Sequence, residues 1–514
     1  MTRGQGECSQ EGYALKRKPN QRSSRSSDRH PLRVLLVSLP FRYFPLLRYR
    51  RLNYARPPLG IASLAAYLRA HARAPLEVKC HDFMVDAGPD RAAVRDRILS
   101  YEPDLVGFSV LTASQPLAIW LALELKRLRP AIRIVAGGPH ITALPDEPMP
   151  GVDAKILGEG ERSLLEFIEK GIHEDEAGAI AGVCRVDGSG HVEPGAPRAR
   201  LRSLDELPFA AIDLLPSDAY YHSFPYRGAR RFFTMMTSRG CPFNCSFCAS
   251  RTLWGRRVRW MSVDRVMAEV DSLVRHHGVD LLFFEDDTFT ADQRRTAELL
   301  ARIRREVPDL KWICHTRVDS VEPGLIAEMA ASGCLEVQIG IESGDERVLA
   351  RTNKGILLEQ ARRSVTEFRR HGINVWATFV LGLEEDTPQT LARTIQAAIE
   401  IDPTYASFIT LLPFPGTYLH GVYRDKGFLR TLNWEDYSWY GDPVFDTEHL
   451  TAAQISRFRA RANRDFYLRP SKLYELGRKT IAAGSLREMW RNFLSWSSLA
   501  LPDLRLPGAR PGGN

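Results

Sequence analysis

The feature that most constrains the fold is an alternation of short β-rich runs with helical segments, which begins near residue 32. Short strands joined by helices predict a parallel, doubly wound α/β sheet. Ligands of such sheets bind beyond the carboxyl ends of the strands. The predicted strands are 33–39, 76–82, 105–110, 132–138 and 152–158, and the predicted helices are 57–72, 90–100, 115–128 and 160–171.

A second alternation begins at residue 231 and differs from the first in having six strands. Six strands that are each followed by a crossover predict a partial (β/α)6 barrel. The strands are expected at 231–238, 281–286, 311–316, 335–341, 374–381 and 405–412, and the helices at 262–277, 291–306, 323–332, 358–371 and 387–401.

The length of 514 residues is too great for one hydrophobic core, so at least two domains are expected. The first 30 residues hold +4 of the net charge of +8 and are rich in Ser and Arg, which predicts disorder. No basic patch interleaved with aromatic residues follows, which argues against a nucleic-acid partner. The predicted divisions are a basic tail at 1–31, a Rossmann-like domain at 32–171, a linker with a hairpin at 172–230, the barrel at 231–420 and a mostly helical region at 421–514.

Nothing in the sequence predicts a membrane-spanning helix or a secretory signal. No run of eighteen apolar residues occurs, and no apolar segment follows Lys16, Arg17 and Lys18. The cysteines outside residues 238–250 are scattered, which is typical of the reducing cytoplasm. Residues 485–500 have helical apolar spacing. We expect a helix that covers the barrel, with a peripheral helix at a membrane surface as the alternative.

Three of the eight cysteines stand within "SRGCPFNCSFCAS", at Cys241, Cys245 and Cys248, just after the first predicted barrel strand. Three thiolates on one short loop favour metal binding over disulfides. Residues 249–275 supply no fourth Cys or His, which argues against zinc. An iron–sulfur cluster normally uses four thiolates, so three would leave one iron open to another ligand.

The other predicted barrel strands also end in polar residues, which should gather at one mouth of the barrel. The second strand runs into "EDDTF", the third into "HTR", the fourth into "GIESG" and the fifth into "LGLE". In the first domain, the third strand ends in Ser109-Val110-Leu111 and the fourth in Gly137-Gly138-Pro139-His140. Small residues at strand ends allow a large planar ligand to approach the backbone closely.

Taken together, residues 32–420 resemble the cobalamin-binding radical S-adenosylmethionine family. The resemblance is carried by "RPPLG", "GGPH", "LGEGE", "SRGCPFNCSFC", "EDDTFT", "IGIESG" and "PFPGT", in that order. It implies three cofactors: a [4Fe–4S] cluster, S-adenosylmethionine and cobalamin. It also implies ligands for each. These are Cys241, Cys245 and Cys248 for the cluster; Asp286, Asp287, Arg317, Glu342 and Leu383 for S-adenosylmethionine; and Ser109, Leu111, Gly137, Gly138 and His140 for cobalamin.

One familiar element of cobalamin domains is missing. Residues 38–46 read "SLPFRYFPL", where Asp-x-His-x-x-Gly would supply a histidine below the cobalt. We therefore expect cobalt to lack a protein imidazole. His140 is expected to be a polar loop residue that contacts corrin amides or solvent, with cobalt ligation as the alternative.

The resemblance implies an enzyme that moves a methyl group from methylcobalamin to an unactivated carbon of a small molecule, such as a lipid or a tetrapyrrole. An external donor of the flavodoxin or ferredoxin type would supply electrons. One alternative is a cobalamin-dependent radical cyclase or oxidase, similar to the anaerobic magnesium-protoporphyrin ester cyclases. Another is a non-catalytic corrinoid sensor or a zinc-type nucleic-acid binder, against which the polar barrel mouth argues. The sequence assigns no catalytic side chain.

Overall fold

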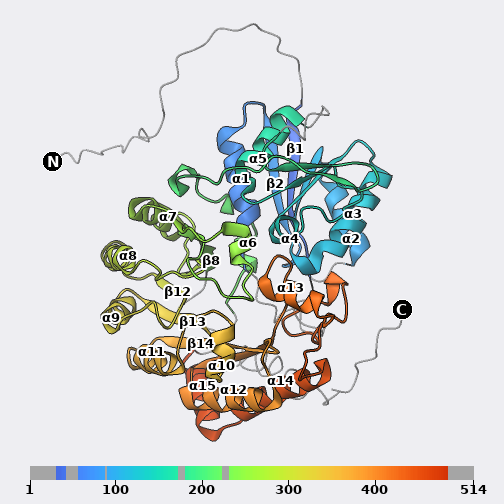
Figure 1. Cartoon of the computed structure of the whole chain (residues 1–514). Helices are drawn as coiled ribbons and strands as arrows, with labels where there is room; N and C mark the ends of the chain where they lie inside the picture. Colours follow the sequence, from blue (N-terminus) through green and yellow to red (C-terminus); the bar gives the residue numbers. More distant parts are fainter. Residues whose placement is uncertain (1–29, 42–55, 87–89, 172–179, 223–230, 484–514) are drawn as a thin grey trace, which may run out of the picture.

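Two mainly parallel sheets organise the chain, with the C-terminal helices packed beside the second (Figure 1). The computed structural model describes residues 30–41, 56–86, 90–171, 180–222 and 231–483. The disordered tail expected at 1–31 lies almost entirely outside these residues, as does the helix expected at 485–500. None of the described helices is long and apolar enough to cross a membrane.

The first sheet has the strand order β2-β1-β3-β4-β5-β6-β7, with β1 to β5 parallel. The order reverses between β1 and β3, as in doubly wound sheets, which confirms the predicted fold class. The predicted hairpin is also confirmed: β6 and β7 pair antiparallel and extend this sheet beyond residue 171. The strands are β1 Leu32–Ser38, β2 Leu76–Asp82, β3 Leu105–Ser109, β4 Arg133–Gly137, β5 Ala154–Ile156, β6 Val183–Val186 and β7 Val192–Glu193; the helices are α1 Leu59–His71, α2 Arg91–Ser100, α3 Gln115–Leu128, α4 Pro139–Ala143 and α5 Gly160–Glu166, which continues as a π turn over Phe167–Gly171.

The second sheet is the predicted partial barrel, with six parallel strands in the order β8-β11-β12-β13-β14-β15. Its helices lie in a row along the outer side (Figure 1). The strands are β8 Phe232–Met235, β11 Leu281–Phe284, β12 Lys311–Thr316, β13 Cys334–Glu342, β14 Asn374–Leu381 and β15 Tyr405–Thr410; the helices are α7 Val263–Arg275, α8 Gln293–Glu306, α9 Pro323–Ala331, α10 Glu346–Arg351, α11 Leu358–Arg370 and α12 Pro388–Ile401.

The barrel helices form where the sequence combines an apolar stripe with a cap. In α7, Val263, Val266, Val270 and Leu273 are buried at helical spacing, and the Ser262 hydroxyl accepts a hydrogen bond from Arg265 N. Thr387 caps α12 in the same way. Because these signals are local, the sequence predicts these helices closely.

Between β8 and α7 lies a small insertion that no sequence pattern predicts. β9 (Ser238–Arg239) pairs antiparallel with β10 (Arg259–Trp260), and the cysteine loop and α6 (Ser250–Trp254) connect them. Gly240 has φ +108°, and a Cβ there would lie 2.6 Å from the Arg257 carbonyl oxygen. A residue with a side chain would therefore push the two strands apart.

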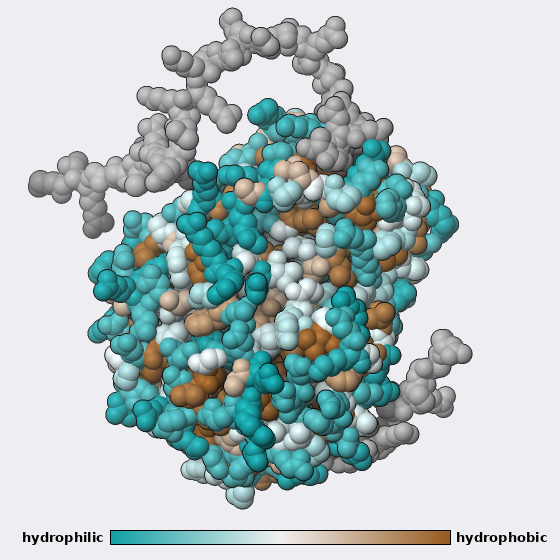
Figure 2. All heavy atoms as spheres, in the orientation of Figure 1, coloured by the Kyte–Doolittle hydropathy of each residue, from teal (hydrophilic) through white to brown (hydrophobic). Residues whose placement is uncertain are grey.

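The C-terminal region is helical, as predicted, and it protects the barrel edge. Its helices are α13 Tyr418–Asp425, α14 Ala452–Tyr467 and α15 Pro470–Ala483. The hydroxyl of Tyr467 bonds both the N and the O of Ala406 in the edge strand β15. Backbone groups that an edge strand would leave open are thereby satisfied. The face shown in Figure 2 is mostly hydrophilic, with apolar side chains in small scattered groups.

Candidate active site between the two sheets

A buried carboxylate, that of Asp286, holds the segment that precedes the loop with the three cysteines. Asp286, directly after β11, accepts hydrogen bonds from the Thr237 amide and hydroxyl and from the Ser238 hydroxyl. Burial raises the pKa of Asp286, and the hydrogen bonds from Ser238 and Thr237 oppose that shift. Asp286 therefore holds the segment that leads into the loop, and its contacts are with protein.

Two cationic side chains, Arg317 and Lys354, lie near Cys245. Arg317 Nη1 lies 3.9 Å from Cys245 Sγ, and the guanidinium stacks 3.6 Å from the centre of the Phe243 ring. Burial raises the pKa of the Cys245 thiol, while Lys354 and Arg317 oppose the shift. Three thiols on one loop, one of them beside two cations, fit an anionic iron–sulfur cluster.

The described residues offer no site for a single metal ion. The described residues contain no group of three or more His, Cys, Asp or Glu side chains arranged to hold one ion. Thiolates that hold a four-iron cluster bind different iron atoms, so they need not converge on one point.

Glu342, at the end of β13, is held in a strained conformation beside this loop. Its φ is +72°, and the register between β13 and β14 shifts there. The carboxylate is buried and paired with Lys354. A Cβ at Gly340 would lie 1.9 Å from Glu342 Oε1, so only glycine leaves room for the carboxylate. The barrel thus fixes one carboxylate and one ammonium group next to the cysteines.

The other two residues predicted to bind S-adenosylmethionine differ in exposure. Asp287 is exposed and accepts a hydrogen bond from Ser250, two residues after Cys248. Leu383 is only 1% exposed, and its amide donates to Asp386 Oδ2 at 2.9 Å. Its contact with adenine stays a prediction.

In the first domain, Gly138 is required by the packing of the protein itself. Its φ is +108°, and a Cβ there would lie 2.9 Å from both the N and the O of Val110. Gly137 O accepts from Val110 N at 2.8 Å, so the segments after β3 and β4 are bonded together. The sequence suggested that glycine is needed here so that a corrin can approach the backbone. The close packing of Gly138 against Val110 already explains why the residue is glycine.

His140 does not contact solvent, which corrects one part of the sequence interpretation. The residue is 1% exposed. Its Nε2 lies 2.7 Å from Glu147 Oε2 and its Nδ1 lies 3.3 Å from Thr112 Oγ1, and Trp434 packs edge-on against the ring. Cobalt ligation by this ring would require breaking one of these contacts.

A buried ion-pair network joins the two domains at the cysteine loop. Arg239, two residues before Cys241, bonds Glu159 at 2.9 Å and Glu161 at 2.6 Å. Arg259 also bonds Glu159, at 2.8 and 2.9 Å. Burial would raise the pKa of Glu159, but Arg259 and Arg239 lower it below its ordinary value. Glu159 and Glu161 belong to "LGEGE" and Arg239 to "SRGC", two motifs that the sequence marked without showing that they meet.

An apolar cavity of about 220 Å³ opens between the domains. Its lining includes Leu111 and Pro139 from the first domain, Leu253 from α6, and Tyr437 and Trp439 from the C-terminal region. Within the described part of the chain, the Tyr437 hydroxyl is buried without a hydrogen-bond partner. Apolar walls and one unpaired donor fit the edge of a corrinoid, which is larger than this cavity and would extend beyond it.

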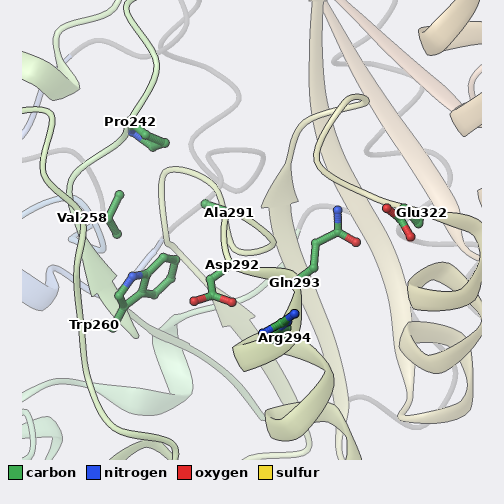
Figure 3. Close-up of a pocket in the computed structure, with 8 residues that line it drawn as sticks. All are labelled: Pro242, Val258, Trp260, Ala291, Asp292, Gln293, Arg294 and Glu322. Atoms are coloured by element: carbon green, nitrogen blue, oxygen red, sulfur yellow. The ribbon is translucent and has the colours of Figure 1, made fainter.

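Another hollow lies beside β10, and Figure 3 shows its lining. Its volume is about 670 Å³. The lining includes Pro242 from the cysteine loop, Trp260 from β10, and Asp292, Gln293 and Arg294 at the start of α8. No cysteine lines it.

Comparison with known proteins agrees with this geometry. The radical SAM superfamily matches residues 235–398, and the B12 binding domain matches residues 50–168. An uncharacterized methyltransferase of Pyrococcus horikoshii is 34% identical over 81% of this chain and 89% of its own length. The anaerobic magnesium-protoporphyrin IX monomethyl ester cyclase of Rubrivivax gelatinosus is 27% identical over 78% of this chain and 71% of its own.

Among solved structures, the cobalamin-dependent S-adenosylmethionine radical enzyme OxsB, with aqua-cobalamin and S-adenosylmethionine bound, has the same fold. The TM-score is 0.66 at 18% identity, and the match covers 90% of this chain and 71% of that one.

The chain therefore belongs to the radical S-adenosylmethionine enzymes that carry a cobalamin-binding domain. The sequence-based expectations of an enzyme and of three cofactors, a [4Fe–4S] cluster, S-adenosylmethionine and cobalamin, are confirmed at the level of the family. The individual ligands remain predictions.

Proposed function

We propose that this enzyme transfers a methyl group to an unactivated carbon of a small-molecule acceptor. The observation that carries the proposal is the match to a methyltransferase over 89% of that protein's length. Both domains are therefore shared with that relative, and not the barrel alone.

When bound, the cluster supplies the electron that cleaves S-adenosylmethionine, and the corrinoid carries the methyl group. Cys241, Cys245 and Cys248 would hold the cluster, with Asp286 fixing the approach to their loop. Arg317 and Lys354 would balance its negative charge. The Arg239 network would keep the cluster loop and the corrinoid face in one fixed relation.

The acceptor would enter at the barrel mouth, where polar groups from both domains meet. Arg56, just before α1, bonds both carboxylate oxygens of Glu285, at 2.6 and 2.8 Å. His315 Nε2 lies 3.6 Å from the same carboxylate. These half-buried groups are available to orient a polar part of the acceptor, and we assign none of them a catalytic role.

Ring closure is the second candidate, because the 27% identical relative is named as a cyclase. A tetrapyrrole or a lipid remains our proposed class of acceptor, with an external flavodoxin or ferredoxin as electron donor. None of the seven described cysteines forms a disulfide, and we propose a cytoplasmic enzyme. The peripheral membrane contact proposed for 485–500 falls outside the described residues.

An isotope experiment tests the proposal while the acceptor is still unidentified. The anaerobically reconstituted enzyme, with reductant and cobalamin, is incubated with small-molecule extract and S-adenosylmethionine labelled with a trideuterated methyl group. Methyl transfer predicts a product with the labelled methyl mass, together with one 5′-deoxyadenosine and one S-adenosylhomocysteine. A product formed with 5′-deoxyadenosine, but without added methyl mass or S-adenosylhomocysteine, would favour ring closure and contradict the proposal.

A further inference from the structure

A second interdomain cavity, of about 880 Å³, is strongly basic. It lies between the end of β5, the segment 197–202, and the stretch from α6 to β10. Five arginines and one carboxylate line it: Arg198, Arg200, Arg202, Arg257, Arg259 and Glu159. We call it the basic cavity.

The residues that the structure describes balance only part of the positive charge of the basic cavity. Arg198 is paired with Glu166, and Arg259 shares Glu159 with Arg239. The three other arginines make no ion pair or side-chain hydrogen bond with any part of the chain that the structure describes; they are the exposed Arg200, Arg202 and Arg257. Excess cation charge in a concave site favours an anionic ligand.

Arg259 gives independent evidence for a ligand. Its side chain is 9% exposed, so it is more than nine-tenths buried. Nη1 bonds Glu159 and the Leu201 carbonyl, whereas the buried Nη2 has no hydrogen-bond partner among the described residues. A buried donor without a partner is costly, and an anionic oxygen in the cavity would satisfy it.

We propose that the basic cavity binds a phosphate or phosphonate group carried by the methyl acceptor, which favours a lipid that bears such a group over a tetrapyrrole. The planar guanidinium fork of arginine matches two oxygens of such a group, and several arginines together match its double charge. In assigning the group to the acceptor, the inference rests on the proposed function. The anion site itself does not.

The position of the basic cavity links it to the chemistry of the enzyme. Arg259 in β10 is the direct partner of Arg239 in β9, two residues before Cys241. Thr252 and Leu253 line both the basic and the apolar cavity. An anion bound here would anchor one end of a molecule whose other end reaches the space beside the corrinoid.

The test measures binding of inorganic phosphate by calorimetry to the cluster-loaded enzyme, at fixed ionic strength, with and without cobalamin. The variant Arg200→Gln/Arg257→Gln should weaken phosphate binding at least tenfold. Arg256→Gln is the matched control, because Arg256 is exposed on the same segment but does not line the cavity. Equal weakening by the control, or no phosphate binding to the wild-type enzyme, would overturn the anion site.

A second measurement identifies the source of the group, because cobalamin itself carries a phosphate in its nucleotide tail and cobinamide lacks it. If the acceptor supplies the group, the double variant should bind cobalamin and cobinamide as tightly as the wild-type enzyme. Weaker binding of cobalamin alone would keep the anion site but overturn its assignment to the acceptor. Neither readout requires methyl transfer, so failure of the proposed function and failure of this inference remain distinguishable.

Discussion

The two interdomain cavities share a wall and differ in chemistry. Thr252 and Leu253 of α6 line both. On one side, the apolar cavity is completed by Leu111, Pro139 and residues of the C-terminal region. On the other, the basic cavity is completed by arginines of the linker and of β10. A helix of five residues therefore divides the interdomain space into an apolar part and a charged part.

If the apolar cavity takes the corrinoid and the basic cavity the anion, as we propose, one short helix contacts both ligands. α6 begins two residues after Cys248, so its position is set by the cysteine loop. A corrinoid gains from apolar walls that exclude water, whereas an anion gains from guanidinium groups. Three sets of substitutions should separate the two binding roles: those in the cysteine loop, those in the buried ion-pair network between the domains, and those in the apolar cavity. We expect their effects to decrease in that order.

The largest effect is expected from the cysteines. Replacing Cys241, Cys245 or Cys248 by Ala should abolish reductive cleavage of S-adenosylmethionine, because a cluster held by two thiolates is not retained. Iron content and 5′-deoxyadenosine measure this. Cys184, buried in the first domain, is the control, and Cys184→Ala should keep both.

The same variants sharpen the comparison of the two cavities. Cobalamin binding and phosphate binding should survive the loss of the cluster, since no cysteine lines either cavity. A cysteine variant that kept its iron and its cleavage activity would refute the assignment of this loop.

Glu159 lines the basic cavity and also belongs to the ion-pair network between the domains. The variant Glu159→Gln should therefore lower the stability of the protein while keeping or raising its phosphate affinity. Removing its charge leaves Arg239 and Arg259 underneutralised while buried, which costs about 3–5 kcal/mol of unfolding free energy. Thermal unfolding measures that loss. Phosphate should bind as tightly or more tightly, because the one carboxylate among the described lining residues is gone.

The matched control is Glu166→Gln, which breaks the more exposed pair with Arg198. Its effect on stability should stay below about 1 kcal/mol. If Glu159→Gln lowered the unfolding free energy as little as Glu166→Gln does, the ion-pair network would not hold the two domains together.

The sequence predicts elements whose signals are local. Helix α3 is expected at 115–128 and found there, because its apolar stripe lies within one segment. β9 and β10 escape prediction because strands of two residues form only through their pairing with each other. The family and its cofactors were inferred from motifs spread over both domains, and the three cysteines within eight positions are one of these motifs.

The rest of the site depends on contacts that no local pattern encodes. Glu159 and Arg239 are 80 positions apart in the sequence, and their buried charges are paired only because the two domains pack together. The expected solvent contact of His140 is wrong, because Glu147 and Trp434 bury the ring. Trp434 belongs to the C-terminal region, for which the sequence offered no template.

The smallest effect, and the most diagnostic for the apolar cavity, is expected from Tyr437→Phe. The change removes a buried hydroxyl that has no partner among the described residues, so the cobalamin-free protein should lose no stability and gain up to about 1 kcal/mol. Cobalamin affinity should fall about fivefold, since one hydrogen bond to the ligand is worth about 1 kcal/mol. Tyr220→Phe is the control, because the Tyr220 hydroxyl donates to Asp82 at 3.2 Å and its loss should destabilise the free protein. Unchanged cobalamin affinity in Tyr437→Phe would remove this hydroxyl from the corrinoid site.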